Sequence, residues 1–194
     1  MSESGITSQK LNLTLALCAI LISVASFYAT YLQANAAEKQ VKAMTLPLLQ
    51  YGTSNLDKDT NEPLIQFSIE NAGVGPALVK NLTLTYQDKR YKSIENFLED
   101  CCAKEFEKFQ EKASLDLSKG GYITSTVVNK ILPAQQEIIF YQLHDGEVSN
   151  ALWNKLNIAR SKLQVSICYC SLLDECYVTE KNGVVDSVAE CPVN

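Results

Sequence analysis

The sequence predicts a mainly β protein, in which one N-terminal transmembrane helix precedes an antiparallel β-sandwich with an amphipathic helix as an insert. Three observations predict this class. Residues 11–32 contain no charged side chain. Several short downstream segments alternate apolar and polar residues, as half-buried strands do. Residues 93–113 instead repeat apolar residues at three- and four-residue spacing, as an amphipathic helix does. Turn residues separate the alternating segments, which favours an antiparallel arrangement.

The predicted anchor runs from Leu11 to Leu32, within an uncharged window that lies between Lys10 and Glu38. About 20 apolar residues span the hydrocarbon layer of a bilayer, and a helix satisfies its own backbone hydrogen bonds there. Two alternatives are a buried helix of a soluble core and a cleaved signal peptide, for which Ala34-Asn35-Ala36 fits the A-x-A cleavage pattern. Apolar regions of signal peptides are typically about 7–15 residues long. We therefore expect an uncleaved anchor in the lipid bilayer.

The anchor divides the chain into segments. Residues 1–10 form a polar tail, and residues 33–46 are rich in good helix formers and predict a helical stalk. Pro47 should end that stalk, because the residue before a proline avoids the helical region. Residues 47–194 are long enough for one domain with its own core.

The orientation of the anchor in the membrane is predicted from the cysteines. The distribution of positive charges does not decide it, because Lys10 lies on one side of the anchor and Lys39 and Lys42 lie on the other. Six of the seven cysteines follow the anchor, and an even set in a small domain predicts disulfides in an oxidising compartment. We expect the tail inside a bacterial cytoplasmic membrane and the domain in the periplasm or outside. The six disulfide candidates are Cys101, Cys102, Cys168, Cys170, Cys176 and Cys191.

The first clear strand covers residues 63–71, and a turn follows it at Asn71-Ala72-Gly73-Val74-Gly75-Pro76. Its two glycines permit positive φ, and its proline offers no ladder donor. A phosphate-binding loop would require a helix directly afterwards, whereas residues 81–87 alternate as a strand. Further strands are expected at residues 122–128, 137–143, 163–169 and 176–179, with a short helix at 148–156.

The helical insert at residues 93–113 has Ser93 as its expected N-cap. Cys168 and Cys170 lie on the strand face opposite Val165 and Ile167, so another element must cover that face for disulfides to form. We expect the insert to lie there, with its two cysteines stapled to the strand. Six cysteines allow 15 pairings, which sequence alone does not resolve.

Three motifs carry a resemblance to a known group: Asn71-x-Gly73-x-Gly75-Pro76-Ala77, the Leu132-Pro133-Ala134 turn, and Tyr169-Cys170-Ser171. With the entry segment at residues 47–50, they resemble uncharacterised bacterial membrane-anchored proteins that have an extracytoplasmic immunoglobulin-like domain. The resemblance implies an immunoglobulin-like sandwich and no established reaction.

Charge and composition narrow the function. The formal net charge is −5 without a basic block, which argues against nucleic-acid binding. The single histidine, His144, falls in an expected turn, and the cysteine spacing is not that of a zinc site. We therefore expect neither cofactor nor metal, and a non-catalytic interaction or scaffold module whose partner is another membrane or envelope protein. The alternatives are a thiol–disulfide oxidoreductase that uses the clustered cysteines and a ligand-binding sensor.

Overall fold

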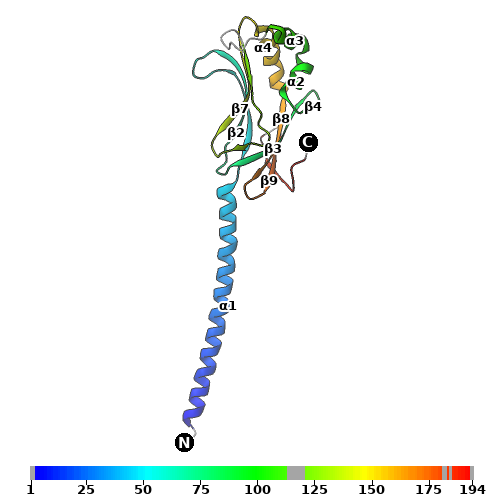
Figure 1. Cartoon of the computed structure of the whole chain (residues 1–194). Helices are drawn as coiled ribbons and strands as arrows, with labels where there is room; N and C mark the ends of the chain where they lie inside the picture. The colour runs from blue at the N-terminus through cyan, green and yellow to red at the C-terminus, as the bar shows by residue number, and fades with distance from the viewer. Residues whose placement is uncertain (1–2, 113–120, 181–182, 184, 193–194) are drawn as a thin grey trace. The chain divides into compact units, whose positions relative to one another are not determined.

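The computed structural model describes residues 3–112, 121–180, 183 and 185–192, and it divides the chain into two compact units, residues 1–44 and 45–194 (Figure 1). The first unit is the helix α1, which covers Glu3–Thr45. Most of the expected polar tail is therefore helical, while Met1 and Ser2 lie outside the described residues. The helix ends two residues before Pro47, as the sequence predicts.

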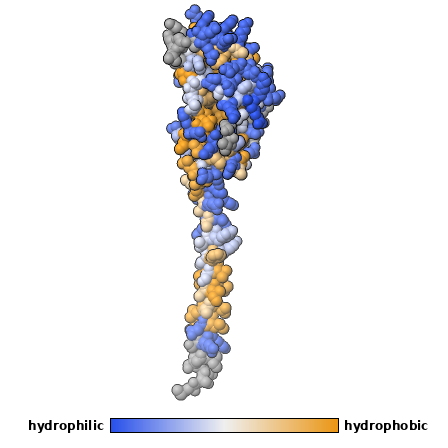
Figure 2. All heavy atoms as spheres, turned by 45° about the vertical axis from the view of Figure 1, so that its right-hand side comes forward, coloured by the Kyte–Doolittle hydropathy of each residue, from blue (hydrophilic) through white to orange (hydrophobic). Residues whose placement is uncertain are grey.

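Helix α1 exposes its apolar side chains. Among the described helices, its Gln9–Thr45 part alone is long and apolar enough to cross a membrane, and none of its apolar window is buried within the chain. Phe27, for example, is 77% exposed. The hydroxyls of Thr14, Ser23 and Thr30 donate to carbonyls four residues earlier, which satisfies their polar groups within the helix. In Figure 2 the middle part of this helix is mostly hydrophobic on the visible face, with hydrophilic residues on either side of it.

The second unit contains two antiparallel β-sheets. In the described residues, one sheet has the order β1-β2-β7-β5 and the other β10-β9-β8-β3-β4, with β6 also paired to β3. The first sheet consists of β1 (Leu49–Leu56), β2 (Pro63–Asn71), β7 (Glu137–His144) and β5 (Tyr122–Thr124). The second consists of β10 (Val185–Val188), β9 (Cys176–Thr179), β8 (Gln164–Ser171), β3 (Ala77–Tyr86), β4 (Lys89–Tyr91) and β6 (Ile131–Leu132).

The two sheets share one hydrophobic core. In the first sheet, Phe67 of β2 lies opposite Tyr141 of β7, and their rings stack at 5.5 Å. In the second, Leu82 of β3 lies opposite Ile167 of β8. The alternation predicted for β2 places its apolar residues in this core. The antiparallel pattern inferred from the turns is therefore confirmed.

Three helices gather at one end of the sheets: α2 (Ile94–Cys101), α3 (Ala103–Lys112) and α4 (Asn150–Ala159) (Figure 1). The predicted cap is present, since Ser93 accepts a hydrogen bond from the Asn96 N–H at 3.3 Å. Phe97 and Phe109 are buried in the core. The insert thus covers an end of the core through its apolar face.

Several predicted boundaries were wrong. The expected single helix at residues 93–113 is two helices, because Cys102 leaves helical geometry with φ −138°; Ala113 lies outside the described residues. The strand expected at 122–128 ends at Thr124, where the chain turns toward β6 and Asn129 adopts a positive φ of 62°. His144 is the last residue of β7 rather than a turn residue. The strands β1, β4, β6 and β10 had no counterpart in the prediction.

Candidate functional site

The predicted turn motif converges on one buried side chain. Asn71 is fully buried, and its Oδ1 accepts hydrogen bonds from the N–H groups of Leu48 (3.1 Å) and Gly73 (3.0 Å). Its Nδ2 donates to the carbonyls of Gly75 (2.8 Å), Leu132 (3.2 Å) and Pro133 (3.1 Å). This one amide therefore joins the entry segment, the glycine turn and the Leu132-Pro133-Ala134 turn.

The two glycines of the turn serve a different purpose from the predicted one. Neither Gly73 nor Gly75 has a positive φ. Instead, a Cβ at Gly73 would lie 2.5 Å from both the Leu46 carbonyl oxygen and the Leu48 nitrogen. The Leu46 carbonyl also accepts from the N–H groups of Val74 (3.1 Å) and Gly75 (3.2 Å). The glycines are thus required for close backbone approach, and Pro76 leads into β3.

All six predicted cysteines form disulfides, but the predicted staple was wrong. Cys101 pairs with its neighbour Cys102, Cys168 with Cys191, and Cys170 with Cys176. Neighbouring side chains on a helix point in different directions, so the bond between Cys101 and Cys102 requires a break from helical geometry. That break separates α2 from α3. The seventh cysteine, Cys18, is free and exposed on α1.

The C-terminal segment, rather than the insert, covers the outer face of β8. Cys168 is 4% exposed and Cys170 is 5% exposed, yet neither belongs to the core between the sheets. The bond to Cys191 holds the C-terminal segment over this face. The Asn81 amide also donates to the Pro192 carbonyl at 3.3 Å. The prediction that another element must cover these cysteines was therefore correct, although the covering element was misidentified.

The helix α2 is fastened to β4 by an ionic cluster. Tyr91 donates a short hydrogen bond to the Asp100 carboxylate, and Lys89 Nζ lies 3.0 Å from the same group. The Tyr91 hydrogen bond, followed by that of Lys89, holds the pKa of Asp100 below its usual value. Burial, followed by the hydrogen bond to Asp100, raises the pKa of Tyr91 to about 12. This cluster attaches the C-terminal end of α2 to β4.

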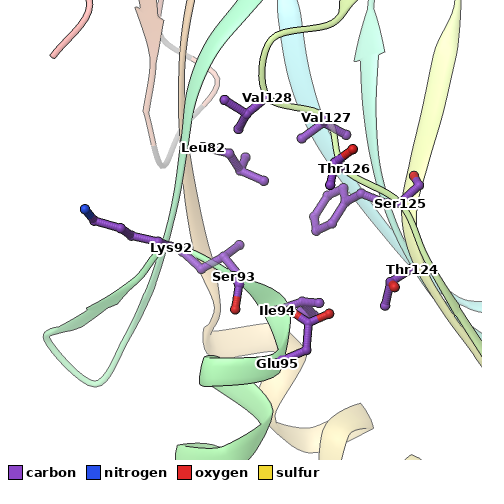
Figure 3. A pocket seen from close by; sticks show the side chains of 12 residues that line it. Leu82, Lys92, Ser93, Ile94, Glu95, Thr124, Ser125, Thr126, Val127 and Val128 are labelled. Atoms are coloured by element: carbon purple, nitrogen blue, oxygen red, sulfur yellow. The ribbon is translucent and has the colours of Figure 1, made fainter. Parts of the chain in front are cut away.

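A pocket of about 370 Å³ opens between the two sheets next to the N-terminus of α2 (Figure 3). Residues of β3, α2, β7 and the segment 124–128 line it. Its apolar floor consists of Leu82, Leu84, Ile94, Val127 and Phe140, and its lining also includes Lys92, Ser93, Glu95, Thr124, Ser125, Thr126 and Val128. In Figure 3 Leu82 faces Val127 across the opening, whereas Lys92 extends away from it.

The wall of this pocket is held at both ends. Ser125 donates its backbone N–H to the Phe140 carbonyl at 3.1 Å and its hydroxyl to the Ile139 carbonyl at 2.7 Å. At the other end, Val79 exchanges backbone hydrogen bonds with Asn129 (2.8 Å) and Lys130 (3.0 Å). These hydrogen bonds attach the segment that forms the wall to β7 at one end and to β3 at the other.

Comparison with protein families, characterised proteins and solved structures finds no match. A proposal for the function of this chain therefore depends on its own sequence and geometry.

The pocket lies beside the edge of β3 that pairs with two short strands. On this edge, β6 pairs with Ala77 and Leu78, and β4 pairs with β3 from Leu84 onward. Sequence reasoning missed this site, because its walls come from segments far apart in the chain. No glycine or proline in the segment 125–128 indicated that β5 would end at Thr124.

Proposed function

We propose that the chain is a single-pass membrane-anchored interaction module. Residues 11–32 span the cytoplasmic membrane, and the disulfide-bonded domain lies on its outer side. The domain is an immunoglobulin-like β-sandwich that binds another membrane or envelope protein and performs no catalysis. The observation that carries this proposal is the Gln9–Thr45 helix, whose large apolar side chains are exposed, joined to a folded domain. Such an apolar surface requires lipid or another apolar partner.

Two features support the orientation and the fold. Six cysteines in disulfides suit an oxidising compartment, since cytosolic thiols are kept reduced. Two antiparallel sheets with a common core suit a sandwich. Asn71 joins two of the three resemblance motifs to the entry segment, which agrees with a shared structural role for them in that group of anchored proteins.

The pocket beside β3 is the favoured contact surface for the partner. A pocket of a binding surface receives side chains of the partner segment. The apolar lining around Leu82 would receive an apolar side chain. Lys92 and Glu95 provide one charge of each sign in the lining.

Site-specific photocrosslinking in intact cells tests this assignment. A benzophenone amino acid at Thr126, an exposed residue of the lining, should give a discrete adduct with one membrane protein. The same probe at Lys155, on the exposed side of α4, is the matched control. The substitution Thr124→Arg, two residues away in the same lining segment, should abolish the adduct at Thr126 without lowering expression. Equal adducts at both probe positions, or none at Thr126, would contradict the proposal.

A ligand-binding sensor is the second candidate, because the pocket volume falls in the range of small-molecule sites. A pocket that binds a small apolar molecule should enhance the fluorescence of anilinonaphthalene sulfonate, and Thr126→Arg should abolish that enhancement. A ligand site predicts dye binding without a protein adduct, whereas a partner site predicts the adduct.

A further inference from the structure

Two disulfides lie next to each other on the outer face of β8. Cys168–Cys191 joins this strand to the C-terminal segment, and Cys170–Cys176 closes the hairpin between β8 and β9. Although they are not bonded to each other, Cys170 Sγ and Cys191 Sγ lie 4.0 Å apart. The sulfur atoms of Cys170, Cys176 and Cys191 all lie within 4.8 Å of one another. Contact of this kind is what thiol–disulfide exchange requires.

We propose that these two disulfides form an exchange site for a thiol, in which opening of Cys170–Cys176 transfers the bond of Cys191 from Cys168 to Cys170. The site depends on neither the membrane anchor nor the pocket beside β3. Its substrate is a thiol that reaches the Cys170–Cys176 bond.

The chemistry requires no net oxidation or reduction. The incoming thiolate attacks Cys176 Sγ and forms a mixed disulfide with it, and the broken bond leaves its electron pair on Cys170. The Cys170 thiolate then attacks Cys191 Sγ, so that Cys170–Cys191 forms and Cys168–Cys191 breaks. The electron pair departs on Cys168, which takes a proton from water. Two disulfides and one thiol enter the sequence, and two disulfides and one thiol leave it.

A hollow of about 590 Å³ gives access to these sulfur atoms. Its lining includes Cys170, Cys176 and Cys191 together with three charged residues, Lys80, Asp174 and Glu190. An ammonium group favours the thiolate form of a cysteine, whereas the two carboxylates oppose an anionic thiol. A neutral thiol such as 2-mercaptoethanol is therefore the appropriate probe.

The geometry of β8 allows the Cys170–Cys191 bond to form. Cys168 and Cys170 lie two residues apart on β8 and point to the same face, about 7 Å apart along the strand. Exchange therefore moves the attachment of Cys191 by one strand period. The expected consequence is a shift of the C-terminal segment along β8, away from its present attachment at Cys168.

The substitution Cys176→Ser tests the transfer step, because it leaves Cys170 as a thiol beside Cys168–Cys191. The full chain in detergent also carries Cys18→Ala, which removes the free thiol of α1. After acid quenching, the unfolded protein is alkylated with N-ethylmaleimide and mapped by peptide mass spectrometry. The label should divide between Cys170 and Cys168. Label on Cys170 alone would overturn the proposal.

The matched control is Cys102→Ser in the same background, which frees Cys101 outside the sulfur cluster. Its label should stay on Cys101 alone. If Cys176→Ser fails to fold, the Cys18→Ala protein is instead exposed to a small excess of 2-mercaptoethanol and mapped in the same way. The expected product has the mixed disulfide on Cys176, a Cys170–Cys191 bond and a free Cys168. A mixed disulfide with Cys168–Cys191 intact, or the absence of any adduct in the folded protein, would overturn the inference.

Discussion

At the scale of single residues, Asn71 has the greatest structural consequence. Its side-chain amide bonds five backbone groups from three segments and is fully buried. Asn71→Ala would leave several of these groups buried without partners, at about 1–3 kcal/mol each. We expect it to lower the free energy of unfolding by about 3 kcal/mol or more, as measured by chemical denaturation of the full chain. Asn154→Ala, on the exposed face of α4, should change it by less than about 0.5 kcal/mol. Equal effects would contradict the role of Asn71.

The Asp100 cluster predicts a pH dependence. Because the folded pKa of Asp100 is lowered by Tyr91 and Lys89, its stabilising contribution is complete above the unfolded pKa of about 3.9. That contribution is lost as the pH falls through the folded pKa. In Asp100→Asn, the free energy of unfolding should therefore decrease less steeply with acidification below about pH 4. Asp57, whose pKa is lowered by the Asp59 and Thr60 backbone N–H groups, contributes equally to both proteins. Parallel pH curves for the two proteins would refute this prediction.

At the scale of elements, the features that could be predicted from the sequence are those set by the pattern of nearby residues. The strand alternation around Phe67, the Ser93 cap and the end of α1 before Pro47 each depend on a few adjacent residues. The disulfide pairing depends on which distant segment covers β8, and no residue near Cys168 identifies the C-terminal segment as that cover. The split of the insert at Cys102 follows from a bond between neighbours, which the helical periodicity of the apolar residues conceals.

The glycine turn at Gly73 and Gly75 was predicted at the correct place but for the wrong physical reason. The turn was predicted from its two glycines. The structure shows that the glycines are required for close approach to the entry segment rather than for positive φ. Gly73→Ala places a Cβ against the backbone of Leu46 and Leu48, so we expect a loss of about 1–3 kcal/mol in unfolding free energy. Gly52→Ala is the matched control, because its Cβ meets the Ser68 hydroxyl, which can rotate away. A thermal unfolding series that ranks Gly52→Ala as the more damaging change would exclude close approach as the reason.

At the scale of the whole molecule, the redox state of the cysteines tests the proposed compartment of the domain. Cys18 lies in the apolar helix as a free thiol, and the other six cysteines are paired. Protein extracted from native membranes, with thiols trapped by N-ethylmaleimide in denaturant, should gain one adduct by intact mass. After reduction the same protein should gain seven, which equals its cysteine content. Seven adducts without reduction would place the domain in a reducing compartment and reverse the proposed orientation. They would also remove the oxidised pairs on which the exchange site depends, whereas the apolar surface of α1 would still require lipid or another apolar partner.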